Sequence, residues 1–450
     1  MKVKKSKKIL LIQAPLDNNN PAGSPVIPPL AILSLANYLK EKSPGLEVKI
    51  MDGQLFGLKI IADNMKLYQP DIVGISFTIR AYENALILAR VAKSLNAQVV
   101  LGGHAATFSA GEILKNRGSC SKDYCVDAVC RQDGEKALLS LTRGLPYSRI
   151  PNLAWMDGND LRFNKIAVCN LNELPFLDFN GLVNLDDYFK TTQEPSGSCR
   201  SGVIVAYSRK GCAWRAKTGG CIFCAVAHPG IQLKSPARYY KEVVYLQERY
   251  KPRLIREASD DFLDDRDWLQ KFRCLIRKRN KQDIKLWIFA RAERINKEII
   301  PCLKDINVAA INFGFESIDD RMLAYMRKGN SGNDIRRAVD LLTDANIEIM
   351  GNFIFGGPKE TKKTLKANLN AIRTFKKINP SMTIISHRFM ILPGSPAWKM
   401  LIRKTGKKYL NQDNPDLEEM DRDWLKYFTR VTPQDVSLAM KEAAPFSKKI

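Results

Sequence analysis

The sequence predicts an α/β protein made of two successive modules, a doubly wound parallel sheet followed by an open, partial β/α barrel. Three observations lead to this prediction. Short β-branched runs alternate with helical patterns through most of the chain, a stretch rich in Pro and Asn interrupts them, and 450 residues suffice for two or three domains. With 45% hydrophobic residues, the chain has the composition of a globular protein.

Residues 1–150 are expected to form the first domain. Its strands are predicted at residues 8–14, 46–52, 71–77, 97–102 and 126–130. Helical patterns separate them, at residues 28–42, 58–68, 82–95 and 109–116. Doubly wound sheets bind ligands at the carboxyl ends of their strands. The candidate ligand contacts are therefore Gln13, residues 52–57, residues 76–80 and residues 102–104.

Residues 151–202 are expected to be a linker, and residues 203–400 to form the second domain. Six strands are predicted there, at residues 203–208, 254–259, 285–290, 309–315, 348–354 and 383–390. Six such units are typical of a partial barrel, whose site lies at the strand carboxyl ends. Residues 401–450 are expected to be a small C-terminal region with amphipathic helices at residues 421–428 and 433–441.

The charge and the apolar runs exclude some classes of protein. The net charge of +24 is spread over both modules, and solubility explains it as well as a nucleic-acid substrate would. No apolar run approaches the ~20 residues of a membrane-spanning helix. The apolar residues 9–12 behind the basic start are too few for a signal peptide. We therefore expect a cytoplasmic protein, whose ten cysteines are thiols or metal ligands.

Three cysteines follow the first strand of the second module. Cys212, Cys221 and Cys224 have the spacing C-x8-C-x2-C in a glycine-rich loop. A structural zinc site normally has four protein ligands, whereas three thiolates on an iron-sulfur cluster leave one iron open for a ligand. Two other interpretations stay open: a zinc ion closed by His228, and three unligated cysteines.

With Phe223 before the last cysteine, this loop resembles that of the radical S-adenosylmethionine superfamily, which holds a 4Fe-4S cluster. The usual spacing there is C-x3-C-x2-C, so Cys221 and Cys224 match better than Cys212, and Cys199 is an alternative first ligand. Further matches follow in family order at the predicted strand ends. The resemblance implies that these residues bind S-adenosylmethionine: Ser259, Asp260, Arg291, Glu316, Gly356 and Gly357.

The first module resembles the cobalamin-binding, Rossmann-like domain that precedes many of these enzymes. The matches are residues 28–39, 70–76, 101–107 and 133–135. The resemblance implies cobalamin contacts from Gln13, Gln54, Ser76, Thr78, Arg80, Gly102, Gly103, His104 and Glu135. Where cobalt has a histidine ligand, the loop reads D-x-H-x-x-G. This chain has Gln54 at the histidine position, so cobalt is expected to lack an imidazole ligand.

Together the resemblances imply a cobalamin-dependent radical S-adenosylmethionine methyltransferase acting on an unactivated carbon. The cofactors would be a 4Fe-4S cluster, cobalamin and S-adenosylmethionine, and no catalytic side chain is assigned. We expect a small-molecule or peptide substrate, an electron donor such as flavodoxin or ferredoxin, and a monomer. His387, in the last predicted strand, is a candidate for the substrate cavity.

Three alternatives are kept. The first is an oxidoreductase or ring-forming enzyme of the same architecture, which the mass of the product would distinguish. The second is a methylthiotransferase acting on transfer RNA, but that family has cluster cysteines where this chain has Gln13, Gln54 and Thr78. The third, a non-catalytic cobalamin sensor, has no need of the Arg291, Glu316 and Gly356 matches.

Overall fold

A computed structural model describes residues 6–16, 27–116, 125–191, 202–228, 230–278, 283–410 and 416–446. The chain forms two compact units, which we describe separately. The first consists mainly of Pro28–Tyr188 with Lys407–Leu417, and the second mainly of Phe189–Gly406 with the residues from Glu418 onward. In the part of the chain that is described, no helix is long and apolar enough to cross a membrane.

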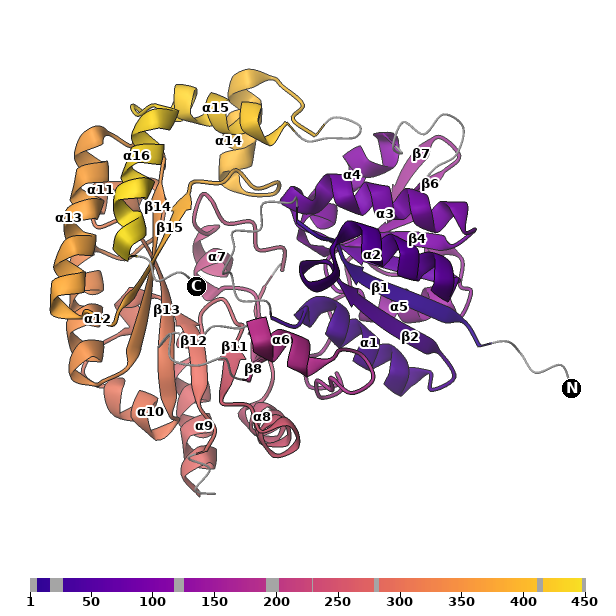
Figure 1. Ribbon diagram of the computed structural model, residues 1–450, viewed down its shortest axis with the longest axis horizontal. Coiled ribbons are helices and arrows are strands. Elements are labelled where there is room, and N and C mark those ends of the chain that lie inside the picture. The colour runs from indigo at the N-terminus through magenta and orange to yellow at the C-terminus, as the bar shows by residue number, and fades with distance from the viewer. Residues whose placement is uncertain are drawn as a thin grey trace, which may run out of the picture. The chain divides into compact units, whose positions relative to one another are not determined.

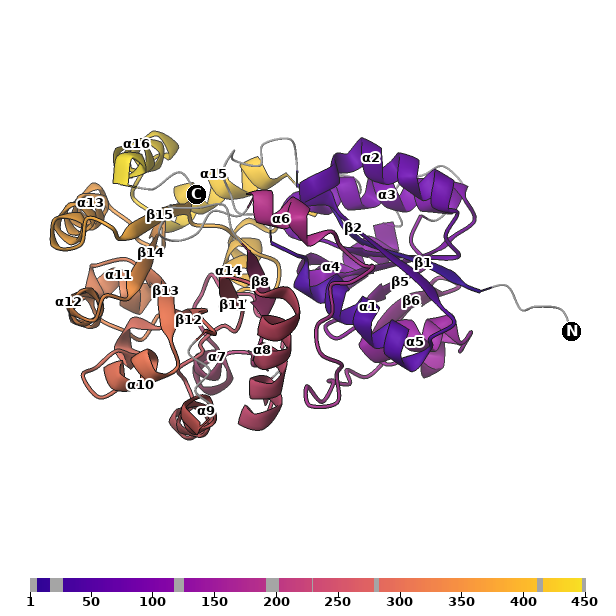
Figure 2. The same cartoon turned by 60° about the horizontal axis from the view of Figure 1, so that its bottom comes forward.

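The first unit contains a seven-stranded sheet in the order β2-β1-β3-β4-β5-β6-β7. Its strands are β1 (Lys8–Gln13), β2 (Glu47–Asp52), β3 (Ile72–Ser76), β4 (Gln98–Gly102), β5 (Ala128–Cys130), β6 (Leu153–Asp157) and β7 (Asp160–Phe163). The helices are α1 (Leu30–Lys42), α2 (Gly53–Tyr68), α3 (Tyr82–Ser94), α4 (Gly103–Asn116), α5 (Glu135–Thr142) and α6 (Leu185–Thr191), with short 3-10 turns η1 (Ile79–Ala81) and η2 (Tyr147–Arg149). Strands β1 to β5 are parallel, and Figure 2 shows α2 and α3 on one face of the sheet and α1 and α5 on the other. This is the predicted doubly wound arrangement.

The region predicted to be a linker contains part of this sheet, which corrects the expectation for residues 151–202. Strand β6 pairs antiparallel with β5, and β7 pairs antiparallel with β6. Two residues, Gly158 and Asn159, connect them, and Gly158 has a φ of +59°. A two-residue turn with a left-handed glycine is a hairpin signal, and the surrounding Pro and Asn residues obscured it.

Two helices of the first unit begin earlier than predicted. Helix α2 begins at Gly53 instead of residue 58, with a break at Gly57, where φ is +68°. Helix α4 begins at Gly103 instead of residue 109 and is interrupted at Ser109. Both helices therefore start directly at the carboxyl ends of their strands, where the predicted contacts lie.

The second unit contains a six-stranded parallel sheet in the order β15-β14-β13-β12-β11-β8, as expected for a partial barrel. Its strands are β8 (Val203–Ala206), β11 (Leu254–Glu257), β12 (Leu286–Ala290), β13 (Val308–Glu316), β14 (Glu348–Phe355) and β15 (Thr383–Arg388), and β9 (Arg209–Lys210) pairs separately with β10 (Gln232–Leu233). The helices up to β15 are α7 (Ala213–Thr218), α8 (Pro236–Tyr250), α9 (Arg266–Lys278), α10 (Ile300–Asp305), α11 (Asp320–Tyr325), α12 (Gly332–Asp344) and α13 (Lys362–Ile378), with 3-10 turn η3 (Ala292–Arg294). After β15 come α14 (Pro396–Thr405), α15 (Leu417–Phe428), α16 (Pro433–Ala443) and η4 (Ala444–Phe446).

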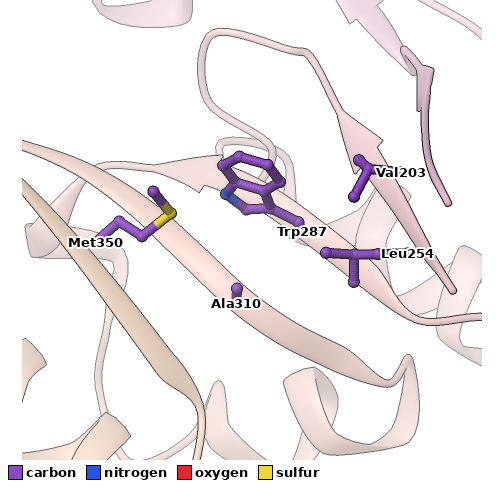
Figure 3. Close-up of a cluster of buried hydrophobic side chains, with 5 residues drawn as sticks. All are labelled: Val203, Leu254, Trp287, Ala310 and Met350. Carbon is purple, nitrogen blue, oxygen red and sulfur yellow. The ribbon is translucent and has the colours of Figure 1, made fainter. Parts of the chain in front are cut away.

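The two faces of this sheet differ. Figures 1 and 2 show α8, α9, α10, α12 and α13 along one face of the strands. On the opposite, inner face, side chains near the strand starts pack together in Figure 3: Val203, Leu254, Trp287, Ala310 and Met350. Because side chains alternate along a strand, residues two positions further on continue the inner face toward the carboxyl ends. The apolar cluster therefore forms the floor beneath those ends.

Candidate functional site

The three cysteines lie where the chain leaves β8 of the second unit. Cys212 is the N-cap residue of α7, and Cys221 and Cys224 follow that helix. All three are free thiols; Cys221 is buried and the other two are partly exposed. The amide of Cys224 donates to the carbonyl of Cys221 (3.1 Å), and Arg215 donates to the carbonyl of Cys224 (2.9 Å). The loop thus holds Cys221 and Cys224 in one local turn.

Charged side chains from the ends of β12 and β13 and from the segment between α11 and α12 lie around Cys221. Lys328 donates to the Glu316 carboxylate at 2.9 Å, and both side chains are buried. Arg291, at the end of β12, pairs with Glu293 at 2.5 Å, donates to the carbonyl of Lys328, and hydrogen-bonds Cys221. The structure therefore brings together Cys221 with the predicted residues Arg291 and Glu316.

These charges affect the Cys221 thiol. Burial raises the pKa of Cys221, while Lys328 and Arg291 oppose this increase because they stabilise the thiolate. Burial also raises the pKa of Cys224, to about 11. A thiolate ligand of iron needs positive charge beside it in such a buried place. Lys328 and Arg291 supply this charge next to Cys221.

Sequence analysis did not identify Lys328. It lies twelve positions after Glu316, and nothing in its neighbourhood distinguishes it from a surface lysine. Its ammonium group also lies 5.9 Å from the centre of the Phe223 ring. Phe223 was predicted as a contact, and the structure places it beside the same charged group.

Two glycines allow this close packing. A Cβ at Gly314 would lie 2.2 Å from Oε1 of Glu316 and 2.7 Å from Nζ of Lys328. A Cβ at Gly329 would lie 2.3 Å from the ring of Trp214, which donates to the carbonyl of Arg327 at 2.8 Å. The segment around Lys328 can approach the cysteine loop because neither glycine has a side chain.

Ser259 and Asp260 lie beneath and beside the loop. The Ser259 hydroxyl donates to Glu257 at 2.7 Å and accepts from the amide of Arg209 at 3.2 Å, so it joins strand β11 to the start of the loop. Asp260 is exposed, and its charge raises the pKa of Cys224. Although part of Asp260 is accessible, desolvation of its carboxyl group raises its pKa, Glu257 and Asp261 add to the increase, and His228 opposes it only in part. Asp260 therefore belongs to the surroundings of the cysteine loop.

Gly356 and Gly357 follow β14, and a buried carboxylate holds both. Their amides donate to Oε2 of Glu360 at 3.2 and 3.3 Å. A Cβ at Gly357 would lie 2.3 Å from the methyl group of Met326. Burial raises the pKa of Glu360 to about 7. These glycines thus pack on the segment that leads to Lys328, with their amides already bonded.

The three free thiols and the cationic side chains beside Cys221 are compatible with the ligands of an iron-sulfur cluster. Among the described residues, no three His, Cys, Asp or Glu side chains stand close enough to hold one metal ion. This gives no support to a zinc ion held by the three cysteines and His228. Cysteines on a four-iron cluster bind separate irons, so their sulfurs stand farther apart. The free thiols on one loop, with cationic neighbours, fit that arrangement. Cys199 lies outside the described residues.

In the first unit, three predicted contacts lie side by side at the carboxyl edge of the sheet. Gln13 pairs in register with Ser76, and Ser76 with Gly102. Gly103 has a φ of +87°, and a Cβ there would lie 2.7 Å from the Ser76 hydroxyl. The strand order reverses between β1 and β3, and a doubly wound sheet binds its ligand at such a point. Gln13, Ser76 and Gly102 therefore lie at the edge where a doubly wound sheet binds its ligand.

The other predicted contacts of this unit lie in different surroundings. Gln54 is exposed at the start of α2, where its backbone amide donates to the Asp52 carboxylate at 3.0 Å. Thr78 and Arg80 are exposed after β3. His104 packs on the ring of Phe108 in α4. Glu135 is buried and accepts hydrogen bonds from Ser34 (3.2 Å) and Cys169 (3.6 Å). Its carboxylate is therefore turned into the unit.

Two families match the chain over separate parts. The model of the Radical SAM superfamily matches residues 210–372, and that of the B12 binding domain matches residues 24–142. Together they cover both sheets and the cysteine loop. The matched regions therefore coincide with the two groups of predicted contacts.

Relatives and solved structures agree with this division. The chain is 28% identical to an uncharacterized methyltransferase of Pyrococcus horikoshii, over 86% of the chain and 82% of that protein. It is 22% identical to an anaerobic magnesium-protoporphyrin IX monomethyl ester cyclase of Cereibacter sphaeroides, but spans only 50% of that protein. The methyltransferase TsrM of Kitasatospora setae, with cobalamin and a [4Fe-4S] cluster bound, has a TM-score of 0.71 at 17% identity, over 89% of this chain and 75% of TsrM. The cobalamin-dependent radical enzyme OxsB has a TM-score of 0.70 at 18% identity, over 97% of this chain and 66% of OxsB. At these identities the likeness establishes the fold.

Proposed function

We propose that this chain, which matches the models of the Radical SAM superfamily and of the B12 binding domain, is a cobalamin-dependent radical S-adenosylmethionine methyltransferase. Its substrate receives the methyl group on an unactivated carbon. One observation carries the proposal: a cysteine loop with cationic neighbours follows β8, in the same chain as a doubly wound sheet whose strand order reverses where the predicted cobalamin contacts lie. The methyltransferase of Pyrococcus horikoshii, matched over most of both chains, supports it.

Cys212, Cys221 and Cys224 would hold the 4Fe-4S cluster, whose open iron would take S-adenosylmethionine. When bound, the cluster supplies the electron that makes a carbon radical from S-adenosylmethionine, and cobalamin carries the methyl group. Arg291 and Lys328 stabilise the Cys221 thiolate by their charge. Glu316 neutralises Lys328, so the group around the cysteine keeps a balanced charge.

In the first unit, the edge formed by Gln13, Ser76 and Gly102 would receive cobalamin. Gly103 lets α4 start at once after β4, so its first amides lie at the same edge. Gln54 offers an amide in place of an imidazole, and this leaves cobalt without a histidine ligand from this loop. A weakly ligated cobalt suits a cofactor that gives and takes a methyl group.

The remaining parts of the proposal concern partners. The substrate is a small molecule or peptide, and a one-electron donor such as flavodoxin or ferredoxin reduces the cluster. The enzyme works as a monomer in the cytoplasm. Nucleic acid is not proposed as a substrate, because the basic residues are spread over the chain.

Product analysis tests the proposal. Mass spectrometry of a deletion strain identifies metabolites or proteins that lack a methyl group, and these are given to the reconstituted enzyme. Radical methylation consumes two molecules of S-adenosylmethionine, so each turnover must yield both 5'-deoxyadenosine and S-adenosylhomocysteine. A methyl label from S-adenosylmethionine must appear in the product. Formation of 5'-deoxyadenosine with an unmethylated product would instead indicate an oxidoreductase or a ring-forming enzyme.

Cysteine variants test the cluster ligands separately. Cys212→Ala, Cys221→Ala and Cys224→Ala should each lose the cluster absorption and the formation of 5'-deoxyadenosine. Cys274→Ala is the control, because Cys274 is exposed on α9 and away from the loop sequence. A full cluster in Cys212→Ala would show that another residue, such as Cys199, is the first ligand.

A further inference from the structure

A cationic side chain on the inner face of the second sheet, Arg256, has no ionic partner among the described residues. Arg256 lies on β11, two positions after Leu254, which belongs to the apolar floor in Figure 3. Side chains alternate along a strand, so Arg256 shares the inner face with Leu254. The next residue, Glu257, faces the helix layer, where its charge acts on Tyr239 of α8. Arg256 thus extends the inner face toward the carboxyl ends.

Two aromatic rings hold the Arg256 guanidinium. Its central carbon lies 5.0 Å from the centre of the Trp287 ring and 4.9 Å from that of Phe289. Both rings come from β12 and are nearly parallel, with 17° between their planes. Stacking on rings satisfies the flat faces of a guanidinium, whereas its five N–H donors point outward in its plane. The rings therefore orient the group without using its donors.

The donors of Arg256 have no acceptor in the described protein. Its Nε is fully buried and makes no hydrogen bond, and no carboxylate pairs with the guanidinium among the described residues. Burial alone lowers the pKa of Arg256, to about 10, and no nearby acid opposes this decrease. The guanidinium is half-buried, with its Nε cut off from water and no carboxylate beside it, so such a site favours a ligand that brings the opposite charge.

Two asparagine side chains and a histidine continue this layer across the sheet. Asn352 of β14 donates to Asn312 of β13 and to the carbonyl of Phe313 at 2.8 Å. The ring of His387 in β15 lies 3.0 Å from Oδ1 of Asn352. In register, Asn312 pairs with Phe289, which contacts Arg256. Above the apolar floor there is thus a polar layer with Arg256 at one end, in the part of a barrel where enzymes bind their substrates.

We propose that the substrate carries an oxyanion, a carboxylate or phosphate, that Arg256 binds on the inner face of the barrel. This inference names the substrate class for the proposed methyltransferase and rests on that function for the reaction itself. A planar guanidinium matches both oxyanions with two parallel hydrogen bonds. The stacked rings add an apolar surface beside the anion. The carboxylate of S-adenosylmethionine is the other source of such an anion, and the experiment separates the two.

The test uses the full-length chain and defined probes in isothermal titration calorimetry. Benzoate and phenyl phosphate carry the anion beside an apolar ring, and benzamide is the neutral counterpart of benzoate. We expect one of the anions to bind with a Kd of about 1 mM or tighter. Benzamide should bind at least about tenfold more weakly, because it cannot form the charge-assisted pair.

Substitutions identify the residue. Arg256→Gln should weaken anion binding at least about tenfold, and Arg256→Lys should keep part of it, because the charge remains. Arg253→Gln is the matched control, since Arg253 is exposed just before the same strand. Circular dichroism checks that each variant is folded, and Arg256→Lys keeps the test decisive should Arg256→Gln not fold.

The outcomes separate this inference from the proposed function. Failure of both anions to bind the wild-type chain, or equal binding to Arg256→Gln, would overturn the inference. Loss of S-adenosylmethionine binding in reconstituted Arg256→Gln, by the same factor as the loss of anion binding, would assign Arg256 to the cofactor and also overturn it. Because anion binding needs no turnover, a failure of methyl transfer would leave an Arg256-dependent anion site in place.

Discussion

At the scale of single residues, Gly314 decides whether the charged group beside Cys221 can form. The Gly314→Ala variant would place its Cβ 2.2 Å from Glu316 and 2.7 Å from Lys328. We expect the buried ion pair to separate, lowering the free energy of unfolding by about 3 kcal/mol, because Lys328 then keeps a buried charge without a partner. Urea denaturation of the full-length variant and of the full-length wild type measures this change.

Gly230→Ala is the control for this prediction. No atom lies within 4 Å of the Cβ position at Gly230, so its substitution should change the free energy of unfolding by less than about 0.5 kcal/mol. Equal stability of Gly314→Ala and wild type would mean that the Lys328 side chain can move aside without loss.

Glu360 gives the second unit a stability that depends on pH. Its pKa rises from 4.5 to about 7 on folding because the carboxyl is buried. Between these values the folded chain keeps a proton that the unfolded chain has lost, so stability falls as pH rises from about 4.5 to 7. The interval corresponds to at most about 3 kcal/mol.

The Glu360→Gln variant should lack this dependence. The difference between its free energy of unfolding and that of the wild type should increase by up to about 3 kcal/mol from pH 5 to pH 8, because the wild type loses stability over this range. Urea denaturation at each pH measures this difference. The variant's stability at a single pH decides nothing, because the amide nitrogen of a glutamine cannot accept the hydrogen bond that Oε1 of Glu360 accepts from the Thr364 hydroxyl. A difference that stays constant over this pH range would contradict the assigned pKa.

Most of the residue-scale contacts could not be read from the sequence. The cysteine spacing, Arg291 and Glu316 were recognisable because they stand at strand ends in a known order. Lys328 was missed because its partner Glu316 approaches only after β13 ends and the chain folds back through α11. The Gly356 and Gly357 amides point to Glu360, a pairing that a glycine motif alone does not reveal.

At the scale of elements, helix α13 connects the Gly356 turn to the helix layer. Thr361 caps this helix: its hydroxyl accepts from the amide of Thr364 at 3.2 Å, and the Thr364 hydroxyl accepts from the amide of Thr361 at 2.9 Å. We expect Thr361→Ala to lower the free energy of unfolding by about 1 kcal/mol, because two helix amides lose their acceptors or alignment. Thermal unfolding followed by circular dichroism measures it.

Thr361→Ser should retain nearly all of that stability, since serine offers the same hydroxyl. A loss as large in Thr361→Ser as in Thr361→Ala would assign the effect to the lost methyl group instead of the cap.

The strands were the easiest elements to predict. All eleven expected strands form, and most of them are short aliphatic runs that are buried along their length. Helix starts were less predictable: α2 and α4 begin on glycines, Gly53 and Gly103, which sequence patterns associate with turns. The β6–β7 hairpin was missed because its strands are short and half exposed.

At the scale of the whole molecule, each unit should respond to its own cofactor. Hydrogen exchange measures this in the full-length chain. Cobalamin should slow exchange of backbone amides at the edge of the first sheet, in residues 10–16, 52–57, 76–82 and 102–108, because a bound ligand stabilises the state that it binds. Reconstitution of the cluster should slow exchange in residues 207–228 and 312–330.

Peptides from residues 153–163 serve as the internal control, since β6 and β7 lie at the far side of the sheet from β1. Protection of this hairpin with none at the β1 and β3 ends would place cobalamin elsewhere on the first unit.

The same hairpin has a consequence for how molecules of this protein meet one another. If the sheet ended at β5, the unpaired backbone N–H and C=O groups of that strand could pair with a strand of another molecule. Strand β7 ends the row instead, with Arg162 placed between Asp157 (3.6 Å) and Asp160 (3.0 Å) in the solvent. Charges along an outer strand discourage edge-to-edge joining of sheets, the first step of aggregation. The charged strand β7 therefore disfavours self-association of the protein through this edge of the first sheet.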